Sequence, residues 1–190
     1  GNRLLPYCER LNIAGGIRRG KLEVHDIELL AQPKKVPAGQ QDIFTGIATK
    51  AVVNADFIKT VNSIGKVIKG KPDGRQMQIE VQNRYGGVKT IMLDLFMPQA
   101  HDYYRMYAIR TGNAEYSNKV IANAWVRKGW VGTDDGLRLE QECFANKGVD
   151  GKIKWRCIAK NPVLPPAWQS EEDFFEWLDL KYIAPKYRQV

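Results

Sequence analysis

The sequence predicts an α+β fold in two domains, residues 1–98 and 99–190. Apolar runs of strand length at 24–31 and 88–96 indicate a sheet in the first domain. A helix-type period over 55–68 indicates a helix between these two strands along the chain. In the second domain, two helical segments precede a short hairpin and a last helix. We therefore expect a mixed sheet with helices on one face, followed by a small α/β subdomain.

Apolar periods and turn residues give the order of elements in the first domain. Pro33, Pro37 and Gly39 interrupt the chain after the strand at 24–31 and predict a loop there. We expect a helix at 4–11, strands at 13–17 and 24–31, a loop at 32–41, a helix at 55–68, and strands at 77–81 and 88–96 joined by a turn at Tyr85-Gly86-Gly87. The last two strands would place Asp94 at the centre of the sheet.

In the second domain, which Pro98 separates from the first, helix stops and prolines mark the boundaries. Three prolines between 162 and 166 exclude regular structure, and Ser170 then caps a helix with acidic residues in its first turn. We expect helices at 99–110 and 115–128 separated by Thr111-Gly112-Asn113, a hairpin of 137–144 and 153–159, and a last helix after Ser170. We expect the five tryptophans of this chain to form core rather than a base-stacking platform.

Composition is that of a globular protein, with 44% hydrophobic and 26% charged residues. The chain has neither a run of about 18 apolar residues nor a signal-type stretch, so we expect a cytoplasmic protein that spans no membrane. Three cysteines, Cys8, Cys143 and Cys157, lack metal-type spacing and indicate buried thiols in a reducing compartment. We expect a monomer.

The net charge of +8 favours anionic partners. Five basic residues crowd one short stretch of the first domain and would follow a phosphate backbone: Lys59, Lys66, Lys69, Lys71 and Arg75. A solvated helix end and turn would give the same pattern. The charge would also attract a triphosphate.

Three acidic residues are candidate metal ligands. Asp26 and Glu28 are two apart on a strand, so their side chains share a face while Ile27 points to the core. Asp94 lies in a second apolar run and joins them if the two strands pair. Carboxylate oxygens suit Mg²⁺ or Mn²⁺ better than zinc. The alternative is a pair of solvent-facing acids.

A glycine-arginine segment precedes the acidic pair. Gly15 and Gly16 lack Cβ atoms and allow close backbone approach to a ligand. Arg18 and Arg19 carry planar, always charged forks that match phosphate oxygens. The segment therefore indicates a phosphate-bearing substrate.

Four blocks, in order, resemble the family X DNA polymerases, the DNA polymerase beta group. GGIRRGKLEVHDIELLA is similar to the nucleotidyltransferase signature, and IMLDLFMP to the strand of the third aspartate. YRMYAIRTGNAEYSNKVIANAWVRKGW resembles the helical stretch around the YFTGS-type motif, and SEEDFFEWLDLKYIAPKYR the C-terminal tail. The resemblance implies a nucleotidyltransferase palm followed by a thumb-like subdomain.

The resemblance also implies two-metal nucleotidyl transfer. Asp26, Glu28 and Asp94 would hold two Mg²⁺ or Mn²⁺ ions, and Arg19 with the backbone of Gly15 and Gly16 would hold a (d)NTP. The resemblance adds four nucleotide-binding residues, Arg110, Thr111, Gly112 and Asn113. It adds four DNA contacts, Asn118, Lys119, Lys69 and Lys71. A core-and-cap role would explain the residues of the second domain equally well.

Several positions depart from the family pattern. This chain has Gly16, Glu28 and His25 where the family usually has serine, aspartate and glycine. It has Ile109 and Arg110 where the family has the aromatic pair that contacts the sugar of the nucleotide. Sugar selectivity is therefore open. Only three residues precede Leu4, so we expect a palm and thumb alone, as in short viral and phage-type members.

We expect an enzyme that adds nucleotides to a 3′-hydroxyl with release of pyrophosphate, by filling gaps in DNA or extending its ends. Transfer to a non-DNA acceptor, such as an RNA end, a small molecule or a protein, is one alternative. A catalytically weakened DNA-binding module is another.

Overall fold

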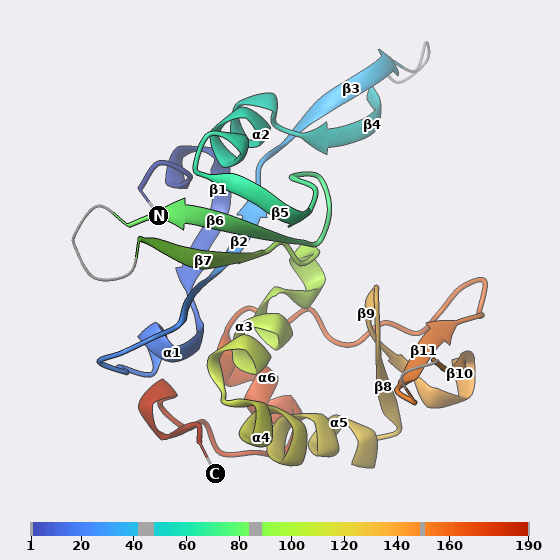
Figure 1. The fold of residues 1–190 in the computed structure, drawn as a ribbon. Helices are drawn as coiled ribbons and strands as arrows, with labels where there is room; N and C mark the ends of the chain where they lie inside the picture. The colour runs from blue at the N-terminus through green and yellow to red at the C-terminus, as the bar shows by residue number, and fades with distance from the viewer. Residues whose placement is uncertain (1, 42–47, 84–88, 149–150, 190) are drawn as a thin grey trace. The chain divides into compact units, whose positions relative to one another are not determined.

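The structure is a computed structural model that describes residues 2–41, 48–83, 89–148 and 151–189. The chain divides into two compact units, Gly1–Pro98 (unit 1) and Gln99–Val190 (unit 2). Both units combine helices with a mixed sheet, so the α+β class is confirmed (Figure 1). No helix of the described ranges is long and apolar enough to span a membrane.

Unit 1 is built on a five-stranded sheet with strand order β1-β2-β7-β6-β5. Its strands are β1 (Cys8–Ile13), β2 (Asp26–Pro33), β5 (Lys66–Gly70), β6 (Gln76–Gln82) and β7 (Thr90–Phe96). β2 and β7 are parallel, and the other neighbours are antiparallel. β7 is therefore the central strand, as the sequence predicts.

One face of this sheet forms the core of unit 1. Leu29, Met77, Ile79, Leu93 and Leu95 are buried there, and helix α2 (Ala55–Asn62) covers them with Phe57 and Val61 (Figure 1). Period-two alternation therefore leaves the even-numbered residues of β2 and β7 on the opposite face. The expected inward side chain of Ile27 is confirmed, since it packs against this core.

Four sequence-based expectations for unit 1 are wrong. Residues 4–11 contain a 3₁₀ turn (Leu5–Tyr7) and then β1, and residues 13–17 lead into a short helix, α1 (Gly15–Arg18). The expected loop at 32–41 contains β3 (Lys35–Gln41), which pairs with β4 (Ala48–Val53) as a separate ribbon. The helix at 55–68 ends at Asn62, and β5 follows. The turn expected at 85–87 lies outside the described residues.

Strand pairing explains these corrections. β1 hydrogen-bonds along β2, so the ladder overrides the helical period of its apolar residues. β5 is similarly held by β6, and a Cβ at Gly65 would lie 2.1 Å from the Glu80 carbonyl oxygen. That close approach requires glycine at position 65, where the chain passes from α2 into β5.

Unit 2 begins with helices and ends with a four-stranded sheet and a last helix. Its helical elements are a 3₁₀ turn (Ala100–Asp102), α3 (Tyr103–Thr111), α4 (Ala114–Tyr116), a π-helical segment (Ser117–Ala122), α5 (Asn123–Arg127), 3₁₀ turns at Glu140–Glu142 and Pro185–Tyr187, and α6 (Glu171–Trp177). Its sheet has the order β10-β11-β8-β9, formed by β8 (Trp130–Thr133), β9 (Gly136–Leu139), β10 (Cys143–Lys147) and β11 (Ile153–Cys157). The strand expected at 153–159 is confirmed as β11, but its expected partner at 137–144 is divided into β9, a 3₁₀ turn and the start of β10, and it is β10 that pairs with β11. β8 was not expected.

Aromatic side chains fill the core of unit 2. Trp125 and Trp168 are buried, and Trp130 and Trp177 pack against the same cluster. The fifth tryptophan, Trp155, lies on β11 outside this core. The expectation that the tryptophans form core therefore holds for four of the five.

The C-terminal segment docks onto unit 2 through a buried ion pair. Ser170 caps α6 as predicted, because its Oγ accepts a hydrogen bond from the Asp173 amide at 3.0 Å. The Ser170 hydroxyl also holds the pKa of Asp173 below its ordinary value. Arg188 is fully buried and donates to both carboxylate oxygens of Glu171, at 2.6 and 3.0 Å. The tail is thereby fixed to the first turn of α6.

Candidate functional site

The register of β2 and β7 brings the predicted acidic residues onto one face of the sheet. Glu28 lies directly opposite Asp94, and Asp26 lies opposite Met92. Directly opposite residues of paired strands share a face, and so do residues two apart on one strand. Asp26, Glu28 and Asp94 therefore all lie on the face away from α2, with Glu28 and Asp94 on strands about 4.8 Å apart.

Asp94 carries an unsatisfied oxygen. Its side chain is half-buried in the central strand, and its Oδ1 is buried with no hydrogen-bond partner among the residues that the structure describes. An unpaired buried carboxylate oxygen is costly, so it favours a bound cation or an added donor. Gln78 of β6 lies opposite Asp94 on the other side.

The backbone at Gly15 lies directly against Glu28. The Ala14 amide donates to the Glu28 carbonyl at 2.9 Å, which places the start of α1 beside β2. Gly15 has a φ of +61°, and a Cβ there would lie 1.8 Å from the Glu28 Oε2. Gly16 lies instead against the Val24 side chain, 2.9 Å from where its Cβ would be. Gly15 is therefore the residue whose missing side chain makes room for the carboxylate.

Arg18 is the last residue of the same short helix, and Arg19 is its C-cap. Arg18 and Arg19 are half-buried, and the Arg19 amide donates to the Gly15 carbonyl at 3.2 Å. This turn follows directly on Gly15, whose backbone lies against the Glu28 carboxylate. Unit 1 thus joins a carboxylate face to a glycine-arginine turn.

The carboxylates of this face are not arranged as a complete set of metal ligands in this structure. Among the described residues, no group of three or more His, Cys, Asp or Glu side chains is placed to hold one metal ion. Three like charges repel one another when no cation lies between them. The donors nevertheless fit Mg²⁺ or Mn²⁺, because all are carboxylate oxygens and the Asp94 Oδ1 lacks a partner.

The nucleotide-binding residues expected in unit 2 surround the junction of α3 and α4. Thr111 is buried, and Asn113 caps α4 by accepting the Tyr116 amide at 2.7 Å. A Cβ at Gly112 would lie 2.7 Å from Ser117 Oγ. Arg110 is half-buried on α3. The geometry gives Gly112 and Asn113 capping and packing roles.

The predicted nucleic-acid contacts are all exposed. Asn118 and Lys119 lie on the π-helical segment, where Lys119 pairs with Glu115 at 2.6 Å. Lys69 lies on β5 and Lys71 just after it. The structure leaves these side chains accessible to solvent.

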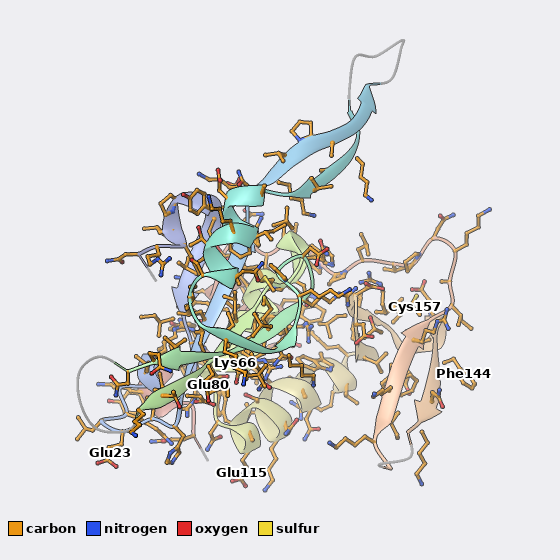
Figure 2. All side chains as sticks on the ribbon, turned by 45° about the horizontal axis from the view of Figure 1, so that its top comes forward. Glu23, Lys66, Glu80, Glu115, Phe144 and Cys157 are labelled. Atoms are coloured by element: carbon orange, nitrogen blue, oxygen red, sulfur yellow. The ribbon has the colours of Figure 1, made fainter. Side chains whose placement is uncertain are left out.

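Sequence reasoning missed a second basic surface, the outer face of the β10–β11 hairpin. Phe144 of β10 is 61% exposed (Figure 2). It lies opposite Arg156, and Asn146 lies opposite Lys154. These four residues share one face of the hairpin, which we call the Phe144 face. Residues 143–160 contain five basic side chains and one acidic one. The signal for this surface was an aromatic residue on one strand and two basic residues, two positions apart, on the strand that pairs with it.

Replacing Gly15 by alanine tests the contact with Glu28. The new Cβ would meet the carboxylate, so Gly15→Ala should lower the free energy of unfolding by about 2–4 kcal/mol and displace Glu28. Gly20→Ala is the matched control, because Gly20 also has a positive φ, +77°, but nothing lies within 4 Å of its Cβ position. Urea denaturation compares the two. Equal losses would contradict the Glu28 contact.

A scan against protein-family models and a search among curated proteins each found no match to this chain. Its own residues and geometry therefore carry the functional argument.

Proposed function

We propose that this chain is a metal-dependent nucleotidyltransferase of the family X type. The observation that carries the proposal is the register that sets Glu28 beside Asp94, with Gly15 closing on the same carboxylate. Two of the four blocks that resemble the family thus lie next to each other, because Glu28 of the first pairs with Asp94 of the second. The unsatisfied Asp94 Oδ1 adds support, since a divalent cation would satisfy it.

The proposed site holds two ions on three carboxylates. Asp26 and Glu28 would serve as ligands to both ions, and Asp94 would serve as a ligand to the ion that activates the hydroxyl. When bound, the ions lower the pKa of a 3′-hydroxyl and neutralise the triphosphate and the pyrophosphate that leaves. The protein positions the carboxylates on a rigid sheet, and positioning supplies much of the catalysis.

The glycine-arginine turn would bind the triphosphate. Arg19 offers a charged fork to the β- and γ-phosphates, and the backbone amide of Gly16 adds a donor without a hydroxyl. Arg18 would brace the turn through a carboxylate. The net charge of +8 attracts both the nucleotide and a nucleic-acid acceptor.

Incorporation assays test this function. The protein is incubated with Mn²⁺ and labelled dNTPs or NTPs, together with a gapped duplex, a single strand or no nucleic acid. We expect label on the 3′-end of the DNA and release of pyrophosphate. Label that transfers without DNA would instead support a non-DNA acceptor. No transfer to any acceptor, with no stabilisation by Mn²⁺-dNTP, would overturn the proposal.

The Phe144 face favours a second candidate function, nucleic-acid binding without catalysis. Aromatic rings stack on bases, and neighbouring cations contact phosphates. A thermal-shift assay separates the candidates, because a ligand stabilises only a protein that binds it. A pure binding module would be stabilised by DNA but not by Mn²⁺-dNTP.

Reversing charge on the Phe144 face should weaken nucleic-acid binding. For the double variant Lys154→Glu/Arg156→Glu, we expect at least a tenfold higher Kd for single-stranded DNA. The slope of log K against log salt should fall by roughly 1.4, because each lost phosphate contact contributes about 0.7. The control Lys181→Glu/Lys186→Glu makes the same charge change on exposed residues near the C-terminus of unit 2. Equal weakening by both variants would indicate only a net-charge effect.

A further inference from the structure

Two cysteines face each other across the β10–β11 hairpin. Cys143 of β10 and Cys157 of β11 are register partners, one residue from each strand. The neighbouring pair, Glu142 and Ile158, is joined by a backbone hydrogen bond of 2.9 Å from the Ile158 amide. Hydrogen-bonded and non-hydrogen-bonded pairs alternate along an antiparallel ladder. Cys143 and Cys157 therefore form a non-hydrogen-bonded pair.

This pair type has the geometry that a disulfide requires. Directly opposed residues in a non-hydrogen-bonded pair have Cα atoms about 4.5 Å apart. Disulfides span Cα separations of roughly 4.4–6.8 Å, so a bond here needs no change of register. The two thiols are close enough to influence each other, since Cys157 helps to raise the pKa of Cys143.

The two thiols are also accessible, in contrast to the third cysteine. Cys143 and Cys157 are half-buried, whereas Cys8 is buried in unit 1, where burial raises its pKa to about 11. All three are free thiols in this structure. Cys8 therefore provides an internal control for any reagent that modifies the pair.

We propose that Cys143 and Cys157 are a redox-modification site, at which a low-molecular-weight disulfide such as oxidised glutathione forms a reversible bond that staples β10 to β11. This inference does not rest on the proposed nucleotidyl transfer. β10 is the edge strand of its sheet, and β11 pairs with β8 only through Trp155 and Thr133. The bond would therefore strengthen the part of the sheet that carries the Phe144 face.

The exchange proceeds in two balanced steps. A Cys157 thiolate attacks one sulfur of oxidised glutathione, forms a protein-glutathione disulfide and releases one glutathione thiolate. The Cys143 thiol then loses its proton, attacks the Cys157 sulfur and releases the second glutathione. In total, two protein thiols are oxidised and one glutathione disulfide is reduced to two glutathione thiols.

The surroundings of Cys143 support this order of attack. Burial raises its pKa most, and the charge and hydrogen bond of Cys157 and the carboxylate of Glu142 raise it further, against an opposing effect of Arg138. The raised pKa disfavours the Cys143 thiolate, which suits Cys143 to the second, resolving step. Its position beside the mixed disulfide makes the second step intramolecular.

Thiol mapping by mass spectrometry tests the site on the full, native chain. The protein is equilibrated with oxidised and reduced glutathione, alkylated, denatured and alkylated again with a second reagent. We expect a peptide pair joined through Cys143 and Cys157, with Cys8 carrying only the second reagent. Cys143→Ser should accumulate glutathione on Cys157 faster than Cys157→Ser accumulates it on Cys143, and Cys8→Ser should behave as wild type.

The disulfide should also change the thermal stability of unit 2. Closing a loop of this length should raise the Tm of unit 2 by roughly 12–24 °C, and a reductant should reverse the shift. The Cys143→Ser variant should show no shift, which excludes a general effect of oxidant. Three free thiols at every glutathione ratio, a bond to Cys8, a bond between chains, or a bond that leaves the Tm unchanged would each overturn the proposal.

Discussion

Asp94→Asn should lower nucleotide incorporation by about a thousandfold or more while leaving the fold intact. The substitution keeps the shape of the side chain but removes the charge that would hold a divalent cation. It also removes the repulsion between Asp94 and Glu28, which lie opposite each other on β7 and β2. We therefore expect an unchanged or higher Tm in the absence of metal, together with lost stabilisation by Mn²⁺-dNTP.

Glu80→Gln is the matched control for this variant. Glu80 of β6 lies opposite Met92 and is therefore on the same sheet face, but its other register partner is Lys66 of β5 (Figure 2). The control removes one negative charge from that face without touching the proposed ligands. Incorporation should stay within a few-fold of wild type. Wild-type incorporation by Asp94→Asn, or equal loss in both variants, would show that the metal assignment is wrong.

Arg188→Met should have the largest effect on stability. Arg188 is fully buried, and its two guanidinium hydrogen bonds neutralise Glu171, which is only 4% exposed. Its Nε also donates to the Ile183 carbonyl at 2.7 Å. Breaking a buried ion pair by removing one partner leaves the other charge without compensation and costs about 3–5 kcal/mol. Urea denaturation should show this loss in unit 2.

Two further variants identify the cause of that loss. Adding Glu171→Gln to Arg188→Met removes the stranded charge and should recover part of the stability, so the two changes should not be additive. Lys128→Met breaks an exposed pair with Asp179, whose side chain is 80% exposed, and should cost less than about 1 kcal/mol. Additive losses at Arg188 and Glu171 would contradict a direct pair.

The central strands of unit 1 were predictable because apolar and polar residues alternate within each strand. Buried side chains alternate with less buried ones over residues 76–80 of β6 and 92–95 of β7, and Asp94 stands between two buried leucines. β1 and the β3–β4 ribbon were not predictable in this way. The first has an apolar spacing that also fits a helix, and the second has the prolines, lysines and glycine of a loop. Both segments form strands because each pairs with a partner strand.

Only the part of the candidate site that follows from side-chain alternation along a single strand could be predicted. The common face of Asp26 and Glu28 follows from their spacing, but the position of Asp94 beside Glu28 depends on the parallel register of β2 and β7. Cys143 and Cys157 depend on register even more strictly. A slip of one residue would put their side chains on opposite faces. Contacts of this kind are set by tertiary structure, and no local pattern reveals them.

The outer strand of the unit 1 sheet has a consequence for self-association. Every residue of β5 is exposed, including Val67 and Ile68, and a regular exposed edge of this kind can recruit a strand from another molecule into a fibre. Two features oppose that growth. Lysines stand at positions 66 and 69, and the register shifts between Val67 and Lys69, which twists the edge away from a flat template. The same lysines that would attract phosphate therefore also act as gatekeepers against aggregation.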